Sequence, residues 1–142
     1  MKTKSKKLKK KSLGIKSRCI YDEIYKANFV FLLNINKDSE VEDILKTKYS
    51  EVFKIYEKEK LKNVFSISDC SGRCIKFQDK NIYVIIIRKL NNKARFNAVL
   101  AHECLHATNF VLGEAGVEFI DNGANEPFTY YLEYLIRNAL SF

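Results

Sequence analysis

The apolar positions of the chain fall into short strand-like runs and longer helix-like segments. Residues 28–33 (NFVFLL) are aromatic and apolar enough for a buried strand, and residues 82–88 (IYVIIIR) give the clearest strand pattern. Residues 64–68 and 74–77 are shorter extended segments. Because a short polar turn separates residues 74–77 from residues 82–88, this pair predicts a β-hairpin.

Helical patterns lie on both sides of these strands. Ser39 and Glu42 have the spacing of a capping box, which predicts an amphipathic helix that ends near Tyr49. Residues 49–61 favour a second helix. The last helix is expected to open at Asn125-Glu126-Pro127, where a proline is tolerated in the first turn, and to run nearly to the C-terminus.

The longest predicted helix spans residues 92–112, which contain no Gly or Pro, and Gly113 offers its stop. Its apolar residues occur on every side, which indicates a buried helix. It carries both histidines of the protein, in the motif HECLH. Positions four apart differ by only about 40° around a helix, so His102 and His106 point from one face and can bind one metal ion. Glu103 lies beside them, as in zinc hydrolases whose carboxylate takes a proton from a metal-activated water.

A zinc site of this kind needs a third protein ligand, and the chain has no further histidine. Glu126 is the favoured candidate, because it lies 20 residues beyond His106 and opens the helix after a loop long enough to fold that helix back. The less favoured acids are Glu114, Glu118, Asp121 and Glu133.

The motif HECLH followed at this interval by Asn125-Glu126 resembles the gluzincin arrangement of the thermolysin type, in which an Asn-Glu at the start of a helix supplies the third ligand. The region from about residue 82 onward also resembles short HExxH proteins of phages and prophages. The resemblance implies that His102, His106 and Glu126 hold Zn²⁺ and that Glu103 is the general base. It also implies an edge strand beside the cleft, for which residues 82–88 are the natural candidate.

The chain departs from the thermolysin-type pattern around its last helix. Tyr130 stands where that pattern has an Asp that orients a histidine, and no histidine remains to stabilise an oxyanion. A tyrosine hydroxyl can donate a hydrogen bond to developing negative charge. Tyr130 is therefore the candidate for this catalytic role, with Tyr131 and Tyr134 as alternatives.

The four cysteines are irregularly spaced, which favours free thiols in a reducing compartment. Cys70 and Cys74 lack the two-residue separation of a metal knuckle and are interpreted as structural or surface thiols. Cys104 lies inside the motif but points about 160° away from His106, and we expect it to pack as a small hydrophobic residue.

The net charge of +8 is concentrated at the N-terminus. Of the 25 basic residues, 9 lie between Lys2 and Arg18, and the remaining 16 face 17 acids. Residues 1–16 are predicted to be a disordered, solubilising tail; the alternative is an arm that makes weak, nonspecific contacts with nucleic acid. No apolar stretch suits a bilayer span or a secretory signal, which favours a cytoplasmic (host-cell) or virion-associated protein without a membrane partner.

These features predict an α+β fold with a tail (1–16) and one zincin-like domain (17–142). In that domain a small antiparallel or mixed sheet packs on a central HExxH helix and a C-terminal ligand helix. The expected function is that of a zinc-dependent metallopeptidase acting on a peptide or protein substrate. The alternative is a non-catalytic phage structural or interaction protein, with a virion or host protein as partner and a structural or vestigial metal site.

Overall fold

A four-stranded mixed sheet forms the centre of the computed structural model, which describes residues 14–58, 66–77, 80–120, 123 and 125–141. The strand order is β1-β2-β4-β3. The outer strands run antiparallel to their neighbours, whereas the two inner strands, β2 and β4, are parallel. The strands are β1 (Lys16–Asp22), β2 (Ala27–Ile35), β3 (Gly72–Lys76) and β4 (Ile82–Arg88).

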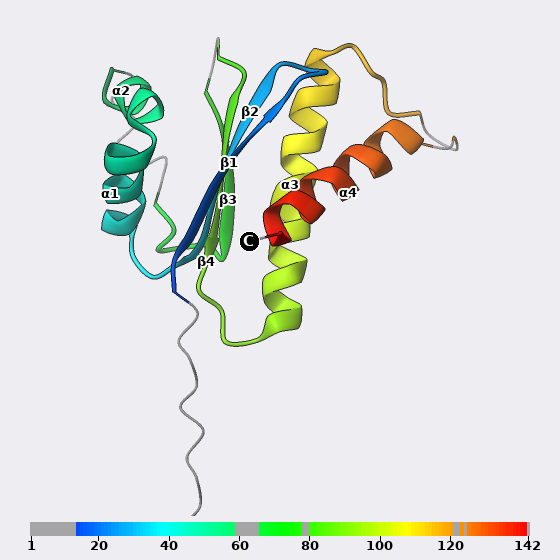
Figure 1. Ribbon diagram of the computed structural model, residues 1–142. Helices are drawn as coiled ribbons and strands as arrows, with labels where there is room; N and C mark the ends of the chain where they lie inside the picture. The colour runs from blue at the N-terminus through cyan, green and yellow to red at the C-terminus, as the bar shows by residue number, and fades with distance from the viewer. Residues whose placement is uncertain (1–13, 59–65, 78–79, 121–122, 124, 142) are drawn as a thin grey trace, which may run out of the picture.

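Helices cover both faces of the sheet, so the domain has three layers (Figure 1). One layer holds α1 (Asp38–Lys48) and α2 (Ser50–Lys58), and the other holds α3 (Lys93–Glu114) and α4 (Glu126–Leu140). The predicted α+β class with a mixed sheet is therefore confirmed. None of the described helices is long and apolar enough to span a lipid bilayer.

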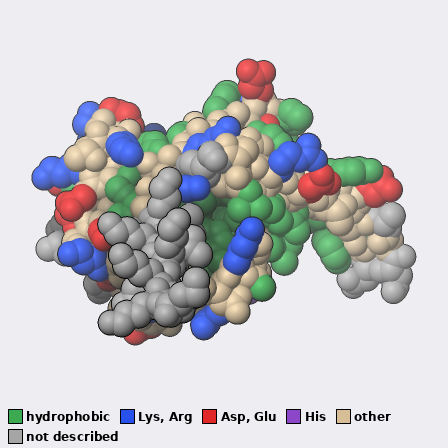
Figure 2. Space-filling view, turned by 60° about the horizontal axis from the view of Figure 1, so that its bottom comes forward, with side chains coloured by type: hydrophobic (Ala, Val, Ile, Leu, Met, Phe, Trp, Pro, Cys, Tyr) green, Lys and Arg blue, Asp and Glu red, His purple; other side chains and the backbone are tan. Residues whose placement is uncertain are grey.

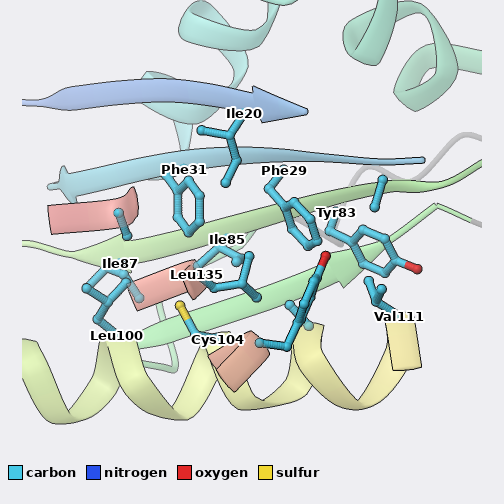
Figure 3. Close-up of a cluster of buried hydrophobic side chains, with 14 of the residues drawn as sticks. Ile20, Phe29, Phe31, Tyr83, Ile85, Ile87, Leu100, Cys104, Val111 and Leu135 are labelled. Atoms are coloured by element: carbon cyan, nitrogen blue, oxygen red, sulfur yellow. The ribbon is translucent and has the colours of Figure 1, made fainter. Parts of the chain in front are cut away.

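The continuous apolar run of β4 follows from burial on both faces. Tyr83, Ile85 and Ile87 point into the core beneath α3 and α4, while Val84 and Ile86 point into the core beneath α1 and α2. Figure 3 shows the first of these cores, in which side chains from the sheet meet side chains from α3. Each fully buried residue of this kind contributes about 1.5–3 kcal/mol of transfer free energy. The predicted hairpin of β3 and β4 is confirmed by their antiparallel pairing.

The ends of α1 and α3 are set by residues other than those expected. Ser39 lies inside α1, and the cap is made by Glu40, whose carboxylate accepts hydrogen bonds from the backbone N–H groups of Asn36 (2.7 Å) and Lys37 (3.3 Å). The bond from Asn36 is the main cause of the lowered pKa of Glu40. The predicted cap was wrong because α1 begins at Asp38, two residues earlier than expected, so Glu40 rather than Glu42 occupies the third helical position.

Helix α3 continues past Gly113 and ends in a Schellman motif. Gly116 adopts φ +73°, a left-handed conformation that favours glycine, and its N–H donates to the Gly113 carbonyl. The N–H of Val117 donates to the Leu112 carbonyl at 2.9 Å, and both side chains belong to the same core. This cap fixes the point at which the chain leaves α3 and turns toward α4.

The remaining predicted elements agree in part. Helix α2 confirms the pattern at 49–61 as far as Lys58, and residues 59–65 lie outside the described part of the chain. Ser66 and Ile67 are not in a strand, although Ile67 is buried. Strand β1 begins at Lys16, the last residue of the predicted tail, and residues 1–13 of that tail lie outside the described residues.

We expect Tyr131→Phe to lower the free energy of unfolding by about 1–2 kcal/mol, because it removes a donor from a buried carboxylate. Asp22 is only 5% exposed and accepts hydrogen bonds from the Tyr131 hydroxyl (2.6 Å) and the Ile24 N–H (2.9 Å). Burial, followed by the bond to Asp22, raises the pKa of Tyr131, so the hydroxyl keeps its proton at neutral pH. Urea unfolding measures the change. The control is Tyr130→Phe, whose ring is 65% exposed; equal midpoints for both variants would contradict the assigned role of the bond.

Candidate active site

Helix α3 presents its two histidines to solvent, one turn apart on the side away from the sheet. The Nε2 atoms of His102 and His106 lie 3.0 Å apart, and the two rings are nearly perpendicular, with centroids 4.7 Å apart. The prediction that α3 is buried all round was wrong: Leu100, Cys104 and Val111 face the sheet, but Leu105 and Phe110 are exposed together with the histidines. The helix is therefore anchored on one face and open on the other.

The spacing of the two ring nitrogens suits a shared metal ion. Lone pairs on both nitrogens cannot face each other at this distance, so either a proton or a cation lies between them. Two ligand nitrogens on a tetrahedral zinc ion, each at about 2.0–2.1 Å, are separated by roughly 3.3 Å. The 3.0 Å between His102 and His106 is close to that value. The pair thus fits two of the four positions around zinc.

Glu103 differs from its neighbours because it is buried, with only 7% of its surface exposed. It lies over Gly72 at the start of β3, where a Cβ would come within 2.9 Å of Glu103 Cγ and 2.6 Å of Val99 Cγ1. A side chain at position 72 would displace both residues of the helix. The absence of one lets the carboxylate approach the backbone of the edge strand closely.

An open cleft of about 470 Å³ runs between this end of β3 and α3. Ser71 and Gly72 form one wall, and Arg95, His102 and Glu103 contribute to the other. Among the described residues, none donates a hydrogen bond to the Glu103 carboxylate or forms an ion pair with it. The carboxylate is therefore available to a molecule in the cleft.

The strand beside the cleft is β3 and not, as expected, residues 82–88. Strand β4 pairs with β2 on one side and β3 on the other, so it cannot be an edge. In the described sheet, β3 pairs only with β4. Sequence reasoning gave Ser71, Gly72 and Arg95 no role in the site. The predicted hairpin could have indicated the correct strand. Strand β4 leads directly into α3, so β3, its partner in the hairpin, can lie beside that helix.

All four cysteines, including those near the site, are free thiols, as predicted. Burial, with a smaller contribution from the charge of Glu103, raises the pKa of Cys104 to about 12 and also raises that of Cys74. Cys104 lies in the core, as expected. Cys70 and Cys74 pack against different cores on opposite faces of the sheet, which agrees with structural thiols rather than a pair.

The third ligand is not in place. Within the described part of the chain no three His, Cys, Asp or Glu side chains form a group that could hold a metal ion. Figure 1 shows that α4 starts apart from the middle of α3 and approaches it toward its own C-terminal end. Glu126, the exposed first residue of α4, forms no metal-binding group with the two histidines. Its role as ligand remains a prediction.

The alternative acids are placed elsewhere. Glu114 accepts hydrogen bonds from Lys76 and Tyr83, and Glu133 pairs with Arg137. Glu118 is exposed, and Asp121 lies outside the described residues.

The tyrosines of α4 do not line the cleft between β3 and α3. Tyr130 is exposed on the outer side of the helix, one turn after Glu126. The Tyr131 hydroxyl instead donates a hydrogen bond to Asp22, and its ring packs against that of Tyr134 with the ring centroids 5.7 Å apart. The catalytic role predicted for Tyr130 therefore also depends on the position of the first turns of α4.

No protein-family profile, curated protein or solved structure matches the chain.

We expect Gly72→Ala to destabilise the protein by about 1–3 kcal/mol, because its methyl group would overlap Val99 and push Glu103 out of place. The matched control is Gly113→Ala. A Cβ at this helical position meets nothing within 4 Å, and the substitution should stabilise the protein by up to about 1 kcal/mol. Urea unfolding of both variants measures the difference. If the two substitutions had the same effect, the close contact between β3 and Glu103 would be disproved.

Proposed function

We propose that the chain is a zinc-dependent hydrolase of the metallopeptidase type that acts on peptide or protein substrates. One observation carries the proposal: two imidazole nitrogens 3.0 Å apart stand next to a buried carboxylate that faces an open cleft. A small mixed sheet whose edge strand borders the HExxH helix supports a zincin-like fold.

His102 and His106 would hold the zinc ion. When bound, zinc supplies Lewis acidity, which polarises a substrate carbonyl and makes water a stronger nucleophile at neutral pH. Glu103 accepts a proton from the attacking water and passes it to the leaving amine. Its position suits this role, because the carboxylate is buried against Gly72 and still lines the cleft that His102 also lines.

Strand β3 would position the substrate. An edge strand has backbone N–H and C=O groups without a strand partner, and an extended peptide can pair with them. Because Gly72 and Glu103 are in contact, a peptide paired along this part of β3 passes close to the carboxylate. Glu126 and Tyr130, the proposed third ligand and oxyanion donor, both belong to the first two turns of α4. Both roles therefore require the same change, in which that end of α4 approaches the histidines.

A second candidate function is that of a non-catalytic protein with a structural or vestigial metal site. It is favoured by the position of α4, since the described residues provide two ligands and not three. A metal held this way would stabilise the fold without supporting hydrolysis.

Glu103→Gln should lower the rate of peptide cleavage by at least about 100-fold, because the amide cannot accept the proton. Zinc content should be unchanged, since Glu103 is not a ligand. The assay uses purified protein with equimolar zinc and a mixture of peptides, read by mass spectrometry. Glu118→Gln is the control, because Glu118 is exposed and outside the cleft. Cleavage that survives in Glu103→Gln rules out its role as base.

Elemental analysis should find one zinc per chain in the wild type and much less after His102→Ala or His106→Ala. Glu126→Ala should also lower the zinc content if α4 supplies the third ligand, whereas Glu133→Ala should not, because Glu133 pairs with Arg137. Zinc at full stoichiometry in Glu126→Ala would exclude this ligand. A protein that binds zinc, melts earlier without it and cleaves nothing would establish the second candidate function.

A further inference from the structure

A second pocket, of about 350 Å³, adjoins the cleft and is lined by basic side chains. Arg88 is the last residue of β4 and Lys89 follows it, whereas Arg95 comes from the first turn of α3. Ser71 and Arg95 line both the pocket and the cleft, so the two lie side by side. The Arg95 guanidinium donates a hydrogen bond to the Ser71 hydroxyl at 3.2 Å, which holds it at this junction.

Among the described residues, no acid balances the positive charge of this pocket. None of those that line it is acidic, and neither Arg88, Lys89 nor Arg95 forms an ion pair with another described residue. Figure 2, which views the molecule from this end, shows Lys and Arg side chains in the middle of the face, and basic and acidic side chains together at its margins. The three positive side chains around this pocket repel each other, so a bound anion would reduce their electrostatic repulsion.

The start of α3 adds to this positive potential. A helix N-terminus favours acidic side chains, yet the first turn of α3 has none and carries Lys93 and Arg95 instead. The Asn92 side chain accepts a hydrogen bond from the Arg95 N–H and so caps the helix. The pocket also lies at the carboxyl ends of the parallel strands β2 and β4, where ligands commonly bind in open sheets. The local sequence thus works against helix stability in a way that an anionic ligand would offset.

We propose that this pocket binds a carboxylate of the peptide substrate, on one side of the bond that is cleaved. This inference rests on the proposed hydrolase function. Arg95 precedes His102 by two helical turns, or about 10 Å along the axis. An extended peptide covers that distance in about three residues. The recognised group is therefore an Asp or Glu side chain about three residues from the scissile bond, or the free C-terminus of a short peptide.

Binding is tested first, without any need for activity. Amide signals of Ser71, Leu90 and Asn92 in ¹⁵N-labelled protein should shift on titration with acetyl-Ala-Ala-Ala bearing a free carboxylate, and not with its C-terminal amide. Acetyl-Ala-Ala-Asp-Ala-Ala-amide shows whether a side-chain carboxylate serves equally. Arg88→Gln/Lys89→Gln should bind at least five-fold more weakly, an effect expected for the loss of two exposed charge pairs.

The control is Lys54→Gln/Lys80→Gln, which changes the net charge equally at exposed positions outside the pocket and should bind as the wild type does. Equal shifts from the acid and amide peptides, or wild-type affinity in Arg88→Gln/Lys89→Gln, would overturn the proposal. So would inorganic phosphate binding as tightly as the peptide, because the pocket would then recognise anions in general.

Cleavage is tested second, with a peptide library and zinc-loaded protein. Wild-type cleavage sites should be enriched for a carboxylate about three residues away, and Arg88→Gln/Lys89→Gln should still cleave but lose that enrichment. Cleavage without any such preference overturns the pocket assignment alone. Carboxylate binding in a protein that cleaves nothing overturns the hydrolase function alone.

Discussion

The packing of one face of α3 against β3 and β4 is the constraint on which both the core and the candidate site depend. Leu100, Cys104 and Val111 fill the space above the sheet, and this fixes the rotation of the helix about its axis. Glu103, one position before Cys104, is then turned toward the edge strand, while His102 is left facing solvent. A rotation of one residue, about 100°, would bury an imidazole and expose a core residue. The geometry of the histidines and the carboxylate is therefore set by hydrophobic packing rather than by contacts among themselves.

Much of this arrangement is encoded locally and could be predicted. The run at 82–88 coincides with β4, because a strand buried on both faces needs an apolar residue at every position. The long segment without Gly or Pro became α3, displaced by one or two residues at each end. The four-residue spacing of the histidines brought their nitrogens together, because helix geometry alone determines that distance. These features depend on periodicity within a single element.

Features that depend on how elements meet were harder to predict. That β3 and not β4 is the edge strand follows from the pairing of β4 with β2, a contact between distant segments that no local pattern contains. The cap of α1 by Glu40 and the Schellman motif at Gly116, just after α3, each required a choice between neighbouring residues of similar propensity. The position of Glu126 depends on the path of the connection between α3 and α4, so a sequence interval of 20 residues does not define a distance in space. Arg95 had no motif to mark it, since its place beside Ser71 arises from the crossing of a loop and a helix.

The parallel pairing of β2 with β4 also has a consequence for the kinetics of folding. Phe29 pairs with Tyr83, and everything from α1 to β3 lies between them in the sequence. Closing so long a stretch of chain costs entropy before any ladder bond forms, and chains rich in such distant contacts cross a high barrier. The β3–β4 hairpin and α3 can form early from local contacts, but the central pair of strands must wait for a long-range encounter. Slow collapse onto β2 is thus expected to limit the rate at which this chain reaches its native state.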